Sequence, residues 1–190
     1  FLEEMAYAAG RDPLEFRLAL MQKQPKSAAV LKAVAEQGGW GQDDGLGRGL
    51  AVLHAFGSYV AACAEITVDD DGSLNMHRIV AATDCGIAVN PQQIEAQVQG
   101  SFVYGLSAAL YSENTLKNGE IQEDNFHTYP SMKIAAMPKV EVIVMPSGGF
   151  YGGVGEPTIG VAAPAVLNAI FAATGKRVRQ LPMRDQSLRA

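Results

Sequence analysis

Residues 59–83 read YVAACAEITVDDDGSLNMHRIVAAT, and this stretch decides the fold. Two segments rich in β-branched and small apolar residues flank the sequence DDDG, a pattern typical of two strands joined by a tight turn. We expect a three-residue loop with Gly72 in the left-handed region. That loop predicts the cross-strand pairs Val68 with Leu74, Ile66 with Met76, Glu65 with His77 and Cys63 with Ile79.

Three helices are expected before this hairpin. The first ends at Gly10, and the second begins at Asp12, which forms a capping box with Glu15. The third is capped by Ser27 and ends at Gly38. A glycine-rich loop over 38–49 follows.

We therefore divide the chain at this loop. Residues 1–40 are a helical segment that continues from a missing upstream region, because the sequence starts without Met in what reads as the middle of a helix. Residues 41–190 form the C-terminal α+β domain. The chain is thus interpreted as a fragment of a longer protein.

Further elements follow the hairpin. Asn90 and Pro91 open a long helix to about residue 112, with Ile94, Val98, Phe102 and Leu106 at helical spacing. A strand is expected at 139–145, and Pro164 opens a last helix that ends at Gly175. The fold class is therefore α+β, with antiparallel strands and helices packed on one side.

The composition excludes several function classes. Fifteen basic and 20 acidic residues are interspersed among 190 and give a net charge of −5, so the chain lacks the basic patch of a nucleic-acid-binding protein. No apolar run reaches the roughly 18 residues of a membrane span. Because any leader would lie upstream of Phe1, the sequence does not indicate a compartment.

The cysteines and histidines do not indicate a metal site. Cys63 and Cys85 are too few for a disulfide framework and lack zinc-site spacing, so two reduced thiols are expected. His54, His77 and His127 fall in different elements, without the close spacing of a metal-ligand pair.

The first candidate site is the run YGGVGEPTIG at 151–160, where Glu156 stands among glycines. A carboxylate just before a helix is often a cap for free backbone N–H groups, and that interpretation stays open. Capping alone does not explain the crowded glycines, because glycine is used where a backbone approaches a ligand closely or takes positive φ.

The second candidate is the junction DCGIAVNPQQIEAQVQG at 84–100, where a strand turns into a helix. Helix N-termini attract anions, and glutamine side chains such as Gln97 both donate and accept hydrogen bonds. The alternative is a solvated polar helix face.

Taken together, the two motifs resemble a known family. ATDCGIAVNPQQIEAQVQGSFVYGLSAAL, followed by GGVGEPTIGVAAPAVLNAIFAATG, is similar to the C-terminal part of the molybdenum-binding large subunit of the xanthine oxidase and aldehyde oxidase family. The segments AAGRDPLEFRLALM and VAACAEITVDDDGSLNMHRIVAATDCG agree in order. The NFHTYP and AVNPQQIEAQVQG forms look most similar to the bacterial isoquinoline 1-oxidoreductase β-subunit group.

The resemblance implies an activity and a site. Members hydroxylate aldehydes or aromatic heterocycles with oxygen derived from water. Glu156 matches the general base, which takes the proton from the Mo–OH group so that its oxygen attacks the substrate carbon while hydride passes to a sulfido ligand. Gln97 matches the glutamine that hydrogen-bonds the cofactor, and the backbone at Val154 and Gly155 is expected beside it.

The resemblance also implies a cofactor and partners. The cofactor is molybdopterin cytosine dinucleotide, shared with the missing upstream segments, and the partners are a small-molecule substrate and an iron–sulfur small subunit. Two cysteines are too few for an iron–sulfur cluster in this chain. An isolated fragment is expected to be inactive. Two alternatives remain: a non-catalytic cofactor-holding or assembly module, and a stand-alone small-ligand binding protein that shares the fold.

Overall fold

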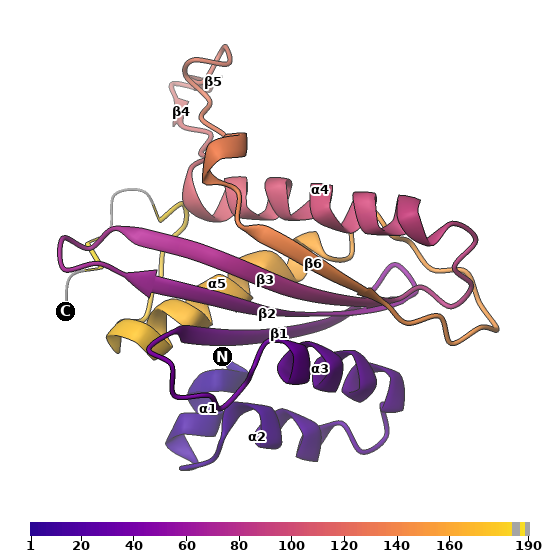
Figure 1. The fold of residues 1–190 in the computed structure, drawn as a ribbon. Helices are drawn as coiled ribbons and strands as arrows, with labels where there is room; N and C mark the ends of the chain where they lie inside the picture. The colour runs from indigo at the N-terminus through magenta and orange to yellow at the C-terminus, as the bar shows by residue number, and fades with distance from the viewer. Residues whose placement is uncertain (184–186, 189–190) are drawn as a thin grey trace.

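The computed structural model describes residues 1–183 and 187–188. A sheet is covered by helices on both faces, and a small hairpin arm projects from the body (Figure 1). In chain order the elements are α1 (Leu2–Ala8), α2 (Pro13–Leu20), α3 (Pro25–Gln37), β1 (Gly47–Ala55), β2 (Ser58–Val68), β3 (Leu74–Asp84), α4 (Pro91–Leu110), β4 (Leu116–Lys117), β5 (Glu120–Ile121), the 3₁₀ helix η1 (Ile134–Ala136), β6 (Lys139–Val144) and α5 (Ile159–Thr174).

The main sheet has the strand order β1-β2-β3-β6. The antiparallel pair β2–β3 is the predicted hairpin, β1 adds an antiparallel strand that was not predicted, and β6 runs parallel to β3. The α+β class is confirmed, and the expectation of antiparallel strands alone is corrected for β6. The chain between β3 and β6 contains the long helix α4, which brings the chain back to the end of the sheet where β3 begins. Two parallel strands require a crossover of this kind.

Helices cover both faces of the sheet, not one as expected. Helix α3 packs on one face, and α4 and α5 pack on the other (Figure 1). The central strands explain this arrangement, because alternate residues of β2 enter two separate cores. Ala62 and Ala64 belong to the core beneath α4 and α5, whereas Ala61 and Cys63 belong to the core beneath α3.

The predicted register of the β2–β3 hairpin is confirmed near the turn and is wrong beyond it. Gly72 has φ +88°, and Val68 pairs with Leu74 as predicted. A bulge between Glu65 and Ile66 shifts the later pairs by one residue. The partners beyond it are Glu65 with Arg78 and Cys63 with Val80, in place of His77 and Ile79.

Several predicted boundaries are also wrong. Helix α3 begins at Pro25, so Ser27 lies inside it, and β1 begins at Gly47, inside the segment expected to be a loop. Helix α5 begins at Ile159 and contains Pro164 in its second turn. Asp12 caps α2 as predicted, since its carboxylate accepts hydrogen bonds from two backbone N–H groups. The division of the chain at residue 40 stays a prediction.

Helix α5 lies unusually close to β1. A Cβ atom at Gly49 would overlap the α5 backbone at Ala165 and Ala169, and one at Gly47 would lie 2.6 Å from the Ala169 carbonyl oxygen. The side-chain amide of Asn168 also donates to the Leu50 carbonyl oxygen at 3.1 Å. Only glycine at positions 47 and 49 permits this approach.

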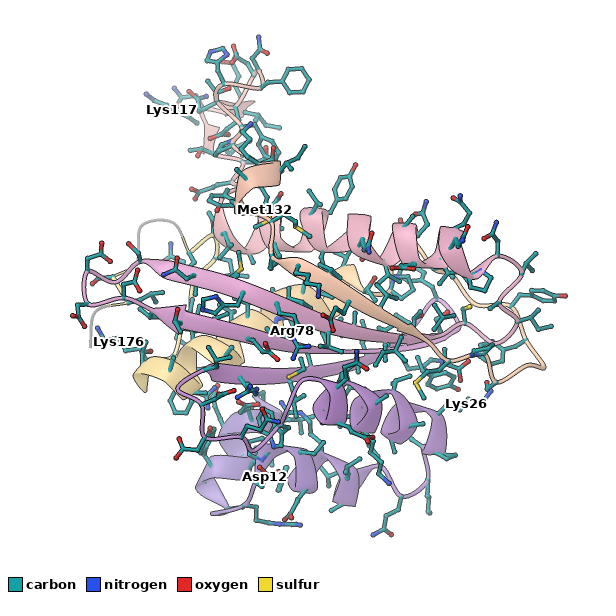
Figure 2. All side chains as sticks on the ribbon, viewed as in Figure 1. Asp12, Lys26, Arg78, Lys117, Met132 and Lys176 are labelled. Atoms are coloured by element: carbon teal, nitrogen blue, oxygen red, sulfur yellow. The ribbon has the colours of Figure 1, made fainter. Side chains whose placement is uncertain are left out.

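Arg78 links three strands and one helix across the other face. Its guanidinium donates to Glu65 on β2 at 2.6 and 3.0 Å and to Glu141 on β6 at 3.1 Å. It also donates to the carbonyl oxygen of Gln37 at the end of α3, at 3.2 Å. Figure 2 labels Arg78 over the middle of the sheet. Because the Glu65 carboxylate is buried, this bidentate pair satisfies a charge that would otherwise be costly to bury.

The arm formed by β4 and β5 projects beyond the end of α4, and Figure 2 labels Lys117 on it and Met132 where it rejoins the body. Several apolar side chains on the arm and just after it are exposed, among them Phe126 at 95% and Ile134 at 96%. None of the helices that the structure describes is long and apolar enough to cross a membrane.

The approach of α5 to β1 makes a testable prediction. Gly49→Ala should lower the free energy of unfolding by about 1–3 kcal/mol, because the added methyl group overlaps helix backbone that cannot move aside cheaply. Gly100→Ala is the matched control. A Cβ there meets no described atom within 4 Å apart from its chain neighbours and the adjacent backbone of α4, so alanine should raise stability by up to about 1 kcal/mol. Urea denaturation of the two purified variants measures both effects, and equal midpoints would contradict this account of the packing.

The burial of the cysteines leads to a second testable prediction. Both are free and buried in the structure, and burial raises the pKa of the Cys63 thiol to about 12. Since the thiolate is the reactive form, roughly 10⁻⁴ of Cys63 should be ionised at pH 8. Alkylation of the native protein at pH 8, followed by mass spectrometry of the Cys63 peptide, should be far slower than alkylation of the urea-unfolded control, because the buried thiol meets the reagent only when the protein opens. Equal rates in the native and unfolded samples would contradict the burial of Cys63.

Candidate functional site

The two candidate motifs meet at one end of the sheet. There β3 and β6 finish, α4 begins, and the chain from β6 to α5 crosses over the strand ends (Figure 1). We call residues 145–158 the connecting loop. It carries Val154, Gly155 and Glu156, whereas α4 carries Gln97.

Asp84 holds the start of the connecting loop. Its Oδ1 atom accepts hydrogen bonds from Gly86 N at 2.9 Å, Ser147 N at 3.3 Å and Ser147 Oγ at 3.0 Å. Backbone bonds continue the contact, from Gly148 N to Gly86 O and from Gly152 N to Cys85 O, both at 2.9 Å. The buried carboxylate therefore fixes the loop to the end of β3.

The turn between β1 and β2 holds the middle of the loop. Gly153 N donates to the Phe56 carbonyl oxygen at 2.9 Å, and the Ser58 hydroxyl donates to the Gly153 carbonyl oxygen at 2.6 Å. A Cβ at Gly152 would overlap the Ser58 hydroxyl. Glycine at position 152 is thus needed for contact within this chain, in addition to any role toward a ligand.

Gln97 lies against the glycine-rich segment. A Cβ built at Gly155 would lie 3.1 Å from Oε1 of Gln97, and no other described atom comes within 4 Å of it. Two positions separated by 58 residues are therefore neighbours. The Gln97 side chain is exposed, and within the described residues its amide has no hydrogen-bond partner.

A pocket of about 300 Å³ opens beside this contact. Gln97 and Val154 line it, together with Cys85, Ile87, Val89, Asn90, Gln93, Ile94, Tyr151 and Gly152. The lining is mostly apolar, with amide groups from the first turns of α4. Burial raises the pKa of the Cys85 thiol, which keeps this wall of the pocket neutral near pH 7.

Glu156 is exposed and follows two residues after Val154, which lines the pocket. Glu156 itself does not line the pocket. Its carboxylate has no hydrogen bond or ion pair with any residue in the described ranges. The N-cap of α5 is Thr158, and the structure shows no side-chain capping bond at this helix start. The capping interpretation of Glu156, which its sequence left open, is therefore not supported, because Glu156 does not cap α5.

Two other glutamines of α4 face different pockets. Gln93 faces the pocket with Gln97, whereas Gln99 faces a second groove of about 990 Å³ between α4 and β6, which contains none of the predicted site residues. Sequence reasoning missed the roles of Asp84 and Ser58 as loop tethers and of Tyr151 in the pocket wall, although Asp84 and Tyr151 lie within the two candidate motifs. For Asp84, the strand-end sequence DCG was the available signal.

The chain is similar in sequence to known proteins. A sequence profile of the molybdopterin cofactor-binding domain matches residues 16–138. The chain is 31% identical to the β-subunit of isoquinoline 1-oxidoreductase from Brevundimonas diminuta, over 96% of this chain and 24% of that one. It is also 31% identical to one of the subunits of nicotinate dehydrogenase from Pseudomonas putida, over 100% of this chain and 18% of that one.

A solved structure shares the fold. The CO dehydrogenase of Oligotropha carboxidovorans superposes with a TM-score of 0.61 at 24% identity, over 70% of this chain and 18% of that one. The chain spans about a quarter or less of the length of these relatives. The profile match covers well over half of the chain, and the chain therefore belongs to the family of molybdopterin cofactor-binding domains of the molybdenum hydroxylases, as its motifs predicted.

Proposed function

We propose that this chain supplies the general base and part of the cofactor site of a molybdenum hydroxylase that oxidises an N-heterocyclic aromatic or an aldehyde. The observation that carries the proposal is the contact between Gln97 and Gly155, beside the unpartnered carboxylate of Glu156. The similarity to subunits of isoquinoline and nicotinate enzymes supports an N-heterocycle as substrate.

The residues of the pocket fit a molybdopterin. Gln97 offers an uncommitted amide that donates and accepts, which matches the mixed donors and acceptors of a pterin edge. The backbone at Val154 and Gly155 is open on that side, because glycine leaves no side chain over it. Since pockets for a whole ligand measure about 300–1,000 Å³, a volume of about 300 Å³ fits part of this large cofactor.

When bound, the cofactor supplies the metal that activates oxygen derived from water and takes up two electrons. The Glu156 carboxylate accepts the proton that this oxygen loses as it bonds to the substrate carbon. Gln97 and the backbone at Val154 and Gly155 orient the cofactor relative to Glu156. In sum, a C–H group and one water become C–OH, with release of two protons and two electrons.

Further groups complete the proposed site. The cofactor carries a cytosine dinucleotide, and upstream segments close the pocket and select the substrate. Residues 41–190 form the cofactor-binding domain, and residues 1–40 form a helical segment that precedes it. The electrons leave through an iron–sulfur small subunit, a proposal supported by the similarity of the chain to proteins that are themselves subunits of larger enzymes.

Glu156→Gln tests the catalytic assignment. The amide keeps the shape of the side chain but accepts a proton poorly, so turnover should fall by about 10²–10⁴-fold while the molybdenum content stays unchanged. Steady-state kinetics and metal analysis of the complete enzyme measure both quantities. Glu120→Gln, an exposed glutamate on β5, is the control and should keep full activity. Full turnover of Glu156→Gln would favour the alternative, a non-catalytic cofactor-holding or assembly module.

Gln97→Ala tests the cofactor assignment. Loss of the amide should lower the molybdenum bound per chain, whereas Gln99→Ala should not, because Gln99 lies two residues further along α4 and faces the other groove. Acid hydrolysis of the wild-type enzyme should release CMP in proportion to molybdenum. Equal metal content in both variants would remove Gln97 from the cofactor site, and molybdenum without CMP would exclude the cytosine dinucleotide form.

A further inference from the structure

A buried pair of hydroxyl groups joins the two halves of the candidate site. Ser101 on α4 and Thr158 at the start of α5 are 3% and 1% exposed, and their side-chain oxygens are hydrogen-bonded to each other. Ser101 lies one helical turn after Gln97, and Thr158 lies two residues after Glu156. The pair therefore connects the element that carries Gln97 to the one that carries Glu156.

The direction of the bond follows from the donors available. Each hydroxyl has one hydrogen. The Ser101 hydroxyl donates to the Val98 carbonyl oxygen at 2.7 Å, so the Thr158 hydroxyl is the donor in the bond to Ser101. The resulting chain runs from Thr158 through Ser101 to the backbone of α4.

The Thr158 hydroxyl bonds to Ser101 in place of the capping bond that a threonine usually makes at a helix start. It is the N-cap of α5, a position where a threonine hydroxyl normally accepts from a free backbone N–H, yet the structure shows no such capping bond. The oxygen is turned toward α4 instead. General packing does not require this, because Gly105 already holds the two helices close, with a Cβ there 2.6 Å from Cβ of Ala162.

We propose that Ser101 and Thr158 are positioning residues that fix the distance between Gln97 and Glu156, and so between the bound cofactor and the general base. This inference rests on the proposed function. A helix start tied to its neighbour by one directional bond cannot slide along it, whereas apolar contacts alone tolerate small shifts. Displacement of a reacting group by about 1 Å can cost roughly 10²-fold in rate.

Thr158→Val removes the hydroxyl and keeps the shape of the side chain. In the complete enzyme we expect kcat to fall by about 10- to 100-fold with little change in KM, and molybdenum to be lost faster during dialysis, because Gln97 and the loop no longer hold their spacing. Thr158→Ser keeps the hydroxyl and should restore both. Ser101→Ala should be the more damaging single change, since it leaves the Thr158 donor without its acceptor.

Two matched controls separate positioning from stability. Thr174→Val removes a hydroxyl on α5 that donates to Ile170, and Ser107→Ala removes one on α4 that donates to Val103 and accepts from Met132. Neither joins the two helices. Both should keep the wild-type kcat, pH profile and molybdenum retention, even where they lower the melting temperature. The Ser101→Ala, Thr158→Val double variant should lose no more kcat than Ser101→Ala alone.

The outcomes are distinguishable when Glu156→Gln is assayed in parallel. If Glu156→Gln is inactive and Thr158→Val keeps the wild-type kcat, pH profile and molybdenum retention, the positioning role is overturned and the proposed function stands. If Thr174→Val reproduces every loss of Thr158→Val, the effect is one of stability and the positioning role is again overturned. If Glu156→Gln is fully active, Glu156 is not the general base, so the proposed function fails and the positioning role toward that base fails with it, whatever Thr158→Val does.

Discussion

The close contact between α5 and β1 is the constraint on which the rest of the structure depends. Without side chains at Gly47 and Gly49, the helix backbone rests directly on the strand, and Asn168 bonds to the strand edge. This contact fixes the depth at which α5 crosses the sheet. The start of α5 then determines where the connecting loop must end, and with it the place of Glu156.

The connecting loop is held along its length by groups from different elements. The Asp84 carboxylate binds its beginning, the β1–β2 turn binds Gly153, and Thr158 binds its end to α4 through Ser101. Such a loop has few conformations left to lose when a ligand binds, which is the physical meaning of a preorganised site. Glu156 is the contrast, since its carboxylate makes no bond within the described chain.

Part of this arrangement could be predicted from the sequence, and the reasons differ from one feature to another. The hairpin turn and its first pairs follow from DDDG, because turn chemistry is local. The bulge at Glu65 could not be predicted, since it brings Arg78 opposite Glu65, and Arg78 also binds Glu141 on β6, far along the chain. The predicted start of α5 was wrong because proline often opens a helix. Pro164 instead lies in the second turn of α5, a helix that packs closely on β1.

The sequence by itself determined the helices α1 to α5, the β2–β3 hairpin with its turn at Gly72, the strand β6, and the two motifs whose order indicates a molybdopterin-binding domain. These rest on local preferences and on residue types that chemistry demands. Only the tertiary structure decided that β6 joins the sheet parallel to β3, that helices cover both faces, and that Gln97 meets Gly155. Such contacts join residues far apart in the chain, and their free energy comes from packing that no local pattern contains.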